Sequence, residues 1–347
     1  MIIKSRDDIQ LDSPNGRVIL EANSPFEVNS THQSKCGVLL VHGLLDCPFS
    51  LREFSNHLKT QNIPSLAILL PGHGTKPKDL LQVNYHDWLT TVRYGMQKMR
   101  EKVDRVFIVG FSTGAALALA HTFEKDDVAG LILLAPIFKL ATPVDLVMRW
   151  HQTFQLKNHI EWISQVDESD YAKYQSVPLH PVIEVVKLGR HILQTSLKKK
   201  LSTPMLMITT EDDETISTPE ALAFFMKNAT PNSELLMYSA KKKMVARDPR
   251  ITQRNSHYPA LHIQQFSHIC LPFSPTNPHY GQSGDFVYAS HPHNTQLMYG
   301  AYNRIETQVS NYLYQLKLLK YRRRILTYNP DFDFTVESIL NFIKKIT

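Results

Sequence analysis

The most restrictive feature of the sequence is a short apolar run that ends in a turn of small residues. Residues 105–109 are β-prone, and an alanine- and leucine-rich segment typical of a helix follows at 115–121. Between them, Gly110 and Gly114 flank Ser112 in a G-x-S-x-G pattern. A sharp strand–turn–helix of this kind exposes the central side chain on a strained backbone, and it needs small residues where larger ones would collide with the neighbouring strand or helix. The pattern predicts a nucleophile elbow with Ser112 at its tip.

A serine before a helix is also a common N-cap, so Ser112 has a purely structural interpretation as well. The backbone at this turn would lie at a helix N-terminus, where unsatisfied N–H groups and the helix dipole favour developing negative charge. A serine hydroxyl is a weak nucleophile unless a base takes its proton and an acid orients that base. The catalytic interpretation therefore depends on finding both partners elsewhere in the chain.

Strand-like and helix-like segments alternate along most of the sequence. Apolar residues at helical spacing, as at 51–58 and 88–99, separate short apolar runs typical of strands buried on both faces. The alternation predicts βαβ units, and so an α/β fold with a mostly parallel central sheet and helices on both faces. At the start of the chain, Asn15-Gly16 predicts a hairpin between 9–11 and 17–20 that forms an antiparallel edge. The predicted strands of the sheet are at 37–41, 65–70, 105–111, 130–136 and 205–208.

The alternation breaks between residues 139 and 203. Aromatic and aliphatic residues are interleaved with polar ones from Trp150 to Ile163, and 181–193 has the spacing of an amphipathic helix. We interpret this region as an inserted helical cap, and we expect the chain to end in packing helices at 297–319 and 335–346. The predicted organisation is a first core part at 1–138, the cap at 139–203 and a second core part at 204–347.

The charge and the cysteine content argue against several classes of protein. The 347 residues include 38 basic and 32 acidic side chains, and the net charge of +6 is too mild to indicate a nucleic-acid partner. Cys36, Cys47 and Cys270 form no disulfide framework pattern and lack metal-type spacing. His291 and His293 have no further ligating residue nearby in the sequence, so no metal site is expected.

No segment has the features of a signal peptide or a membrane span. The N-terminus is charged from Lys4 onward, and the longest apolar run, 128–138, is too short to cross a bilayer. We expect a soluble, cytoplasmic protein without stable membrane insertion, and the sequence specifies no oligomeric state. Basic clusters at 198–200, 241–243 and 322–324 are interpreted either as solvated loops or as faces for peripheral contact with an anionic lipid surface.

The acid is expected after a late strand, because triad residues follow in the order Ser, Asp or Glu, His in folds with this elbow. The strand at 205–208 runs into four carboxylates at 211–214, at the edge where α/β sheets place their ligands. We assign Asp213, with Asp212 next, because a turn of three residues after the strand lets the side chain point back across the sheet edge. The alternative is a solvated turn that caps a helix starting near Thr218.

The base is expected at the end of the last strand. Residues 260–266 have a strand pattern, and His268 lies just after them. Of the 16 histidines, His262 falls inside this strand, His257 before it and His279 in the proline-rich loop after it, and we assign these three ordinary roles. His268 is the predicted general base.

Two backbone N–H groups are needed to bind the oxyanion of an acyl-transfer intermediate. Thr113, the residue after the nucleophile, is expected to supply one, and Leu44 in the turn after the strand at 37–41 the other. Gly43 lets the backbone approach the substrate, and we interpret His42 as a structural hydrogen-bonding residue. Residues 71–74 are expected to form a turn beneath the site.

With these residues identified, the chain resembles the α/β-hydrolase superfamily, and within it the branch of monoglyceride lipases, serine aminopeptidase-like hydrolases and bacterial carboxylesterases. The resemblance implies the α/β-hydrolase fold and hydrolysis of a small-molecule acyl ester without a cofactor. It also implies a triad of Ser112, Asp213 and His268, with Leu44 and Thr113 as oxyanion donors. The matching motifs are Val41-His-Gly43, Pro71-Gly-His-Gly74, Gly110-Phe-Ser-Thr-Gly114, the Asp213 loop and His268.

The sequence departs from the pattern of that branch in three places. Thr210 stands where a glycine usually precedes the acid, a basic and polar segment at 241–257 is inserted before the last strand, and a proline-rich stretch at 274–281 follows the histidine. The leading hypothesis is a serine carboxylesterase or lipase-like hydrolase. The same triad could cleave a thioester or an N-terminal peptide bond, and a catalytically silent α/β-hydrolase-fold binding protein is the alternative from another class.

Overall fold

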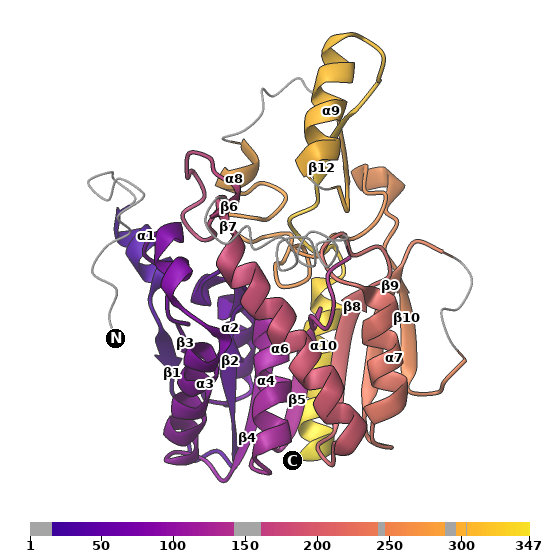
Figure 1. The fold of residues 1–347 in the computed structure, drawn as a ribbon. Helices are drawn as coiled ribbons and strands as arrows, with labels where there is room; N and C mark the ends of the chain where they lie inside the picture. The colour runs from indigo at the N-terminus through magenta and orange to yellow at the C-terminus, as the bar shows by residue number, and fades with distance from the viewer. Residues whose placement is uncertain (1–15, 142–160, 242–246, 289–295, 303) are drawn as a thin grey trace.

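An eight-stranded sheet forms the centre of the molecule (Figure 1). The computed structural model describes residues 16–141, 161–241, 247–288, 296–302 and 304–347. Neighbouring strands are parallel except for β1, which pairs antiparallel with β3 at one edge. In spatial order the strands are β1 (Phe26–Val28), β3 (Ser65–Ile68), β2 (Cys36–Val41), β4 (Arg105–Phe111), β5 (Gly130–Leu134), β8 (Met205–Thr210), β9 (Glu234–Ser239) and β10 (Ile251–Asn255).

Helices cover both faces of this sheet, which is why its central strands are buried and mostly apolar. Every residue of β2, β5 and β8 is buried. On one face α3 (Tyr85–Arg100), α4 (Thr113–Glu124) and α6 (Leu179–Lys198) contact one another, with α7 (Thr218–Asn228) beside them (Figure 1). On the other face α2 (Arg52–Thr60) contacts α10 (Phe332–Ile346). The sheet and its two helical layers confirm the predicted α/β class. Short 3₁₀ turns lie at Pro48–Leu51, Pro77–Gln82 and Pro259–Leu261.

The N-terminal hairpin prediction is wrong for its second strand. Residues 17–20 belong to helix α1 (Gly16–Asn23), and the first strand of the predicted hairpin lies outside the described residues. Ile19 and Ala22 are buried, and the Asn23 side-chain amide donates hydrogen bonds to the carbonyls of Ile19 and Tyr171 at 2.9 and 2.6 Å. Packing against a distant segment thus overrides a local turn signal. The antiparallel edge is formed by β1 instead.

Of the region predicted as a cap, residues 139–141 and 161–203 are described. There β6 (Trp162–Ser164) pairs antiparallel with β7 (Val177–Pro178), and the amphipathic pattern at 181–193 lies within α6. This helix packs against α3 and α4, so it belongs to the helical layer over the sheet. The boundaries of the cap stay a prediction, because residues 142–160 are outside the described part of the chain.

The strand predicted at 260–266 is wrong. That stretch begins with the turn at Pro259–Leu261, and His262 follows with a left-handed backbone (φ 55°). The last strand of the sheet is β10, inside the segment interpreted as a basic insertion. An edge strand is covered on one side only, so β10 needs no continuous apolar run, and Ile251 is its only fully buried residue.

The C-terminal region also differs from its prediction. The helix predicted at 297–319 divides into β11 (Leu297–Gly300) and α9 (Arg304–Gln315), and the arginine cluster after it forms β12 (Arg322–Ile325), which pairs parallel with β11. Before this unit comes the short helix α8 (Asp285–Tyr288). The β11–α9–β12 unit rises above the end of the sheet where the parallel strands have their carboxyl ends (Figure 1). The helix predicted at 335–346 is confirmed within α10. Among the described residues, no helix combines the length and the apolar character that crossing a bilayer requires.

Candidate active site

Ser112 lies in a strained turn between β4 and α4. Its backbone has φ 54° and ψ −112°, and its N–H donates to the Leu134 carbonyl at 2.8 Å. A Cβ atom on Gly110 would lie 2.5 Å from the Ala115 nitrogen, and one on Gly114 would lie 2.0 Å from the Val41 carbonyl oxygen. Only glycine fits at either position, which is the steric requirement expected for the elbow.

The Ser112 side chain does not cap the helix that it precedes. Ser112 occupies the N-cap position of α4, but within the described residues its hydroxyl makes no capping hydrogen bond. Its Oγ is instead 2.9 Å from Nε2 of His268, a residue 156 positions away in the sequence. The N-cap interpretation of this serine is therefore not supported by the geometry.

His268 connects Ser112 to a carboxylate. Its Nδ1 donates to Oδ2 of Asp213 at 2.8 Å, which leaves Nε2 free to accept the Ser112 hydroxyl proton. The other oxygen of Asp213 accepts the N–H groups of Thr215 and Ile216 at 2.9 and 2.8 Å. All three side chains of this hydrogen-bonded chain are buried. The structure therefore brings the three predicted triad residues together.

The loop that carries His268 is held in place from several sides. The His268 N–H donates to Oε2 of Glu214 at 3.0 Å, and the Ser267 hydroxyl donates to the Leu326 carbonyl at 2.5 Å. The neighbouring side chains of Phe266 and Cys270 are fully buried. Although the prediction relied on a strand that is not there, packing and hydrogen bonds place the imidazole correctly.

Two carboxylates near His268 influence its protonation. Burial alone would lower the pKa of His268, but the charge and hydrogen bond of Asp213, with the charge of Glu214, raise it on balance. Burial, together with the charge of Asp213, raises the pKa of Glu214 to about 7. Glu214 was predicted only as one of the four carboxylates at 211–214, and its adjacency to Asp213 is the one signal for it in the sequence.

Among the described residues, Asp212, the alternative acid, forms no hydrogen bond or ion pair with His268. Its Oδ2 is buried with no hydrogen-bond partner among the described residues. Burial, together with the charge of Glu211, raises the pKa of Asp212. Glu211 itself accepts hydrogen bonds from the Ser239 hydroxyl and from Lys241 Nζ at 2.5 and 2.6 Å. The geometry therefore favours Asp213.

The predicted oxyanion donors lie on the two segments that flank the nucleophile. A Cβ on Gly43 would be 3.3 Å from the Ser112 Cβ, so the turn after β2 lies directly against the elbow. In the described part of the chain, neither the N–H of Leu44 nor that of Thr113 has a hydrogen-bond acceptor. The N–H groups on either side of Leu44 are occupied: Gly43 donates to Asp46 at 3.4 Å, and Leu45 donates to His73 Nε2 at 3.2 Å.

Two buried histidines form hydrogen bonds with the turn after β2. His42 donates from Nδ1 to the Gly43 carbonyl at 2.8 Å and accepts the Leu70 N–H at Nε2 at 3.0 Å. Burial lowers the pKa of His42 to about 4 and lowers that of His73 as well. Both rings are therefore neutral near pH 7. His42 has the structural role expected for it, and the turn at 71–74 contributes His73 beneath Leu45.

A buried ion pair connects the turn to the segment between β6 and β7. Lys173 Nζ lies 2.6 Å from Oδ1 of Asp46 and 3.0 Å from the Ser50 hydroxyl. The ammonium also lies over the rings of Phe111 and Phe273, 5.5 and 5.3 Å from their centroids. Lys173 and Asp46 are 127 residues apart, and no feature of the sequence indicated their pairing.

His279 belongs to a second buried cluster beside this ion pair. Its Nε2 donates to Asp170 at 3.0 Å, and its Nδ1 donates to Asp285. Tyr280 donates to the other oxygen of Asp170 at 2.6 Å, and Asp170 also accepts the Lys173 N–H at 3.2 Å. Burial alone would lower the pKa of His279, but the two carboxylates raise it on balance. The proline-rich stretch after His268 is thereby joined to the segment that carries Lys173.

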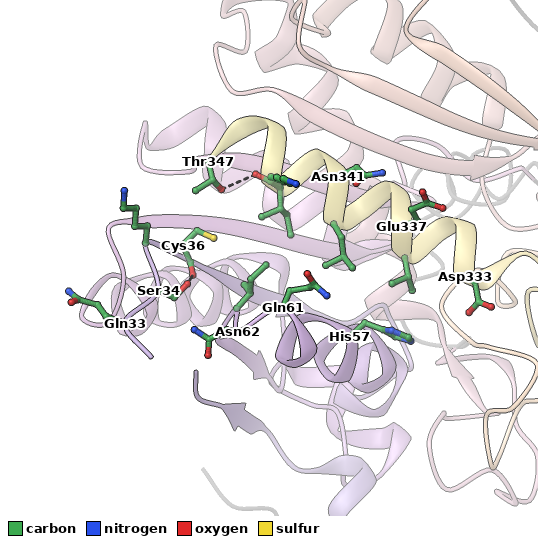
Figure 2. Close-up of a pocket in the computed structure, with 16 residues that line it drawn as sticks. Gln33, Ser34, Cys36, His57, Gln61, Asn62, Asp333, Glu337, Asn341 and Thr347 are labelled. Atoms are coloured by element: carbon green, nitrogen blue, oxygen red, sulfur yellow. Dashed lines mark hydrogen bonds between the residues drawn. The ribbon is translucent and has the colours of Figure 1, made fainter. Parts of the chain in front are cut away.

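The groove in Figure 2 is a separate feature from the residues around Ser112. It has a volume of about 920 Å³ and is formed between α2 and α10, with Cys36 and Thr347 at one end and Asp333 at the other. Cys36 is the first residue of β2, whereas Ser112 follows the last residue of the parallel strand β4. The two residues therefore lie at opposite ends of the strands. No triad residue lines this groove. His291 and His293 lie outside the described residues.

Comparisons with known proteins agree with the fold. A thermostable monoacylglycerol lipase from Bacillus sp. (strain H-257) is 22% identical over 248 residues, covering 70% of this chain and 97% of that protein. A structure reported for LipS and LipT, two metagenome-derived lipolytic enzymes, has a TM-score of 0.54 and 20% identity and covers 62% of this chain and 86% of the other. Monoacylglycerol lipase from Paleococcus ferrophilus has a TM-score of 0.51 and 12% identity, covering 65% and 91%.

The family model that matches this sequence is described as serine aminopeptidase, S33. It matches residues 32–249, which is more than half of the chain and includes the elbow and the Asp213 loop. His268 lies beyond the matched range, so its position comes from the structure. The protein has the α/β-hydrolase fold and belongs to the S33 serine aminopeptidase family.

Proposed function

We propose that this protein is a serine hydrolase that cleaves a carboxylic ester of a small acyl substrate through Ser112, His268 and Asp213. The observation that carries the proposal is the continuous chain of hydrogen bonds from the Ser112 hydroxyl through the imidazole to the carboxylate, at 2.9 and 2.8 Å. The lipolytic relatives favour an ester over a peptide as the substrate.

In the first half-reaction, Ser112 Oγ attacks the acyl carbonyl carbon while Nε2 of His268 takes the hydroxyl proton. Asp213 keeps the imidazole in the required tautomer and stabilises its positive charge. The oxyanion of the tetrahedral intermediate accepts hydrogen bonds from the N–H groups of Leu44 and Thr113, which are otherwise without acceptors among the described residues. When the intermediate collapses, the alcohol leaves with the proton from Nε2 and the acyl-enzyme remains.

In the second half-reaction, water takes the place of the alcohol. Nε2 of His268 removes a proton from the water as its oxygen attacks the acyl carbon, and the acid is released when Ser112 regains its proton. His268 must be neutral at the start of each half-reaction. Because its pKa is raised, activity is lost as the pH falls through a value above the usual pKa of histidine.

Turnover of p-nitrophenyl esters by the wild type and by Ser112→Ala tests the proposal. We expect the variant to lose at least about 10⁴-fold in kcat/KM. Ser338→Ala is a suitable control, because Ser338 lies on α10 and its hydroxyl donates to the Phe334 carbonyl of the same helix. A fluorophosphonate should label Ser112 in the wild type and in the control, as read by peptide mass spectrometry.

Two results would contradict the proposal. Equal turnover by the wild type and Ser112→Ala would remove this hydroxyl from the chemistry. A folded wild type that neither turns over esters nor reacts with the fluorophosphonate would identify a catalytically silent binding protein. A matched series of esters and thioesters with different acyl chains would then define the acyl group and test thioester cleavage, which needs the same triad.

A further inference from the structure

Helix α9 carries an apolar stripe that no part of the described chain covers. Val309 and Tyr312 are three residues apart and lie on one face of the helix, and Leu316 and Leu318 continue this apolar stripe in the turn just beyond its end. Their exposures are 51, 63, 50 and 68%. Nine large apolar side chains are exposed among the described residues, and four of them are in this ten-residue stretch. The stripe is therefore a local concentration.

The opposite side of α9 is fixed to the protein. The buried Ser310 hydroxyl accepts the Arg323 N–H at 2.9 Å, and the Asn311 side chain accepts a bond from Arg322 Nε at 2.8 Å. The helix ends in a regular cap, with Lys317 in a left-handed conformation (φ 58°) and the Leu318 N–H donating to the Leu313 carbonyl at 2.9 Å. The exposed stripe thus belongs to a well-formed helix whose inner face is already packed.

The same unit contains most of the net charge of the protein. Residues 296–328 hold six of the 38 basic side chains and one of the 32 acidic ones, so five of the six net positive charges are here. The rest of the chain is close to neutral. Lys317 and Lys320, which lie next to the end of the stripe in the sequence, are exposed, and so is Arg323 on β12. A second copy of this chain would bring the same positive charge to the contact, which disfavours self-association through this face.

An exposed helical face of apolar residues with cations at its border is typical of segments that lie in a lipid interface. The apolar side chains enter the boundary between headgroups and acyl chains, and the lysines and arginines meet the lipid phosphates. We propose that α9 and the turn after it dock this protein onto an anionic phospholipid surface. Nucleic acid is a less suitable partner, because backbone phosphates provide nothing for the apolar stripe.

The position of this unit relates docking to catalysis. Ile263 bridges to Tyr299 of β11, and Ser267, which precedes the triad histidine, donates to Leu326 just after β12. The unit stands above the carboxyl ends of the parallel strands (Figure 1), and Ser112, which contacts His268, directly follows the carboxyl end of β4. Docking through α9 would therefore hold that end of the sheet close to the lipid. If the proposed ester hydrolysis holds, and this step rests on it, the substrate is an ester taken from the membrane surface.

Vesicle flotation of the full chain tests the docking step without using activity. The probes are vesicles of phosphatidylcholine mixed with phosphatidylserine, and vesicles of phosphatidylcholine alone. We expect wild-type binding to the mixed vesicles, weakened by salt. Each cation near an anionic surface contributes roughly fivefold to partitioning, so Lys317→Glu with Lys320→Glu should reduce binding by at least about 25-fold. Leu316→Glu with Leu318→Glu should reduce it by at least about tenfold.

The matched control is Leu197→Glu with Lys198→Glu. Leu197 is 71% exposed near the carboxyl end of α6, and Lys198 is exposed beside it. Both residues lie at the end of the sheet opposite to α9. This pair should bind vesicles like the wild type. All variants, unlike Ser112→Ala, should hydrolyse a short water-soluble ester at the wild-type rate. Loss of the chemistry and loss of docking are thereby distinguished.

Three results would overturn the docking proposal. The first is a wild type that does not bind the mixed vesicles, and the second is an equal loss of binding in the control pair. The third is a concentration-dependent dimer, seen by analytical ultracentrifugation, that the leucine variants dissociate. That result would assign the stripe to a contact between copies of the protein.

Discussion

Asp213→Asn is the substitution whose outcome the structure specifies most closely. Oδ1 of Asp213 accepts the N–H groups of Thr215 and Ile216, at 2.9 and 2.8 Å, so an asparagine would keep its own carbonyl oxygen at that position. Its amide NH₂ must then face Nδ1 of His268, which at present donates to Oδ2 at 2.8 Å. Two donors cannot face each other, so the imidazole changes to the tautomer that carries its proton on Nε2.

That tautomer cannot accept the hydroxyl proton of Ser112. The expected loss in kcat/KM is on the order of 10⁴, or about 5 kcal/mol of transition-state stabilisation, as for the same exchange in other serine triads. The fold should be retained, because asparagine has almost the same shape and keeps both backbone hydrogen bonds. The assay is p-nitrophenyl ester turnover against pH, with circular dichroism as a check on folding.

Asp212→Asn is the matched control for this experiment. Asp212 is adjacent in the sequence, and its Oδ2 is buried without a hydrogen-bond partner among the described residues. Because burial raises the pKa of Asp212, a neutral amide removes an unfavourable charge, and activity should stay within about twofold of the wild type. The assignment is refuted if Asp213→Asn keeps more than about a tenth of the wild-type activity, or if Asp212→Asn loses as much.

Glu214→Gln should move the acidic limb of kcat/KM to lower pH, because the negative charge of Glu214 contributes to the raised pKa of His268; an unmoved limb in a pH–rate profile would exclude this influence. His279→Gln should destabilise the fold by about 3 kcal/mol, since it leaves the buried Asp170 without its cation. A raised histidine pKa gives stability that is complete below the unfolded value and lost as pH rises through the folded one, so urea unfolding should show a larger effect near pH 6 than near pH 9. Lys173→Met should lower the free energy of unfolding by about 3–5 kcal/mol in the same measurement, because it leaves the buried carboxylate of Asp46 without its cation. It should also lower kcat, because Asp46 accepts a hydrogen bond from Gly43 in the turn beside Ser112. A stability change below about 1 kcal/mol would contradict this.

The elbow was predictable because its constraints are local. Gly110 and Gly114 are required by contacts with backbone a few residues away or on the adjacent strand, and the buried strands on either side are continuous apolar runs. The order of acid and base along the chain follows from the connectivity of the fold, so Asp213 and His268 could be chosen among many carboxylates and histidines. Local sterics and chain order thus predicted the three side chains that the structure brings together.

The incorrect predictions concern segments whose structure depends on distant contacts. Edge strand β10 has one buried side chain, so it has no periodicity that could be recognised. Residues 297–300 form a strand because β12 lies beside them, and the intervening α9 continues the same apolar spacing. The pairing of Lys173 with Asp46 joins segments 127 residues apart. Sequence patterns report which face a residue buries, and they do not report the partner that buries it.

The residues matched by the family model include one part of the candidate active site and leave the other part outside. The elbow, the turn after β2 and the Asp213 loop lie within residues 32–249, and they carry the proposed nucleophile, the predicted oxyanion donors and the proposed acid. His268, His279 and α9 all follow that range. The position of the imidazole is therefore fixed by a region that lies after the matched range. The same region forms a hydrogen bond with Asp170, in the segment that carries Lys173, and it holds the exposed stripe of α9 at the end of the sheet where the imidazole lies. We therefore expect a change in this C-terminal region to alter the proposed lipid contact without disturbing the elbow, and we expect the substrate preference of this hydrolase to be determined there.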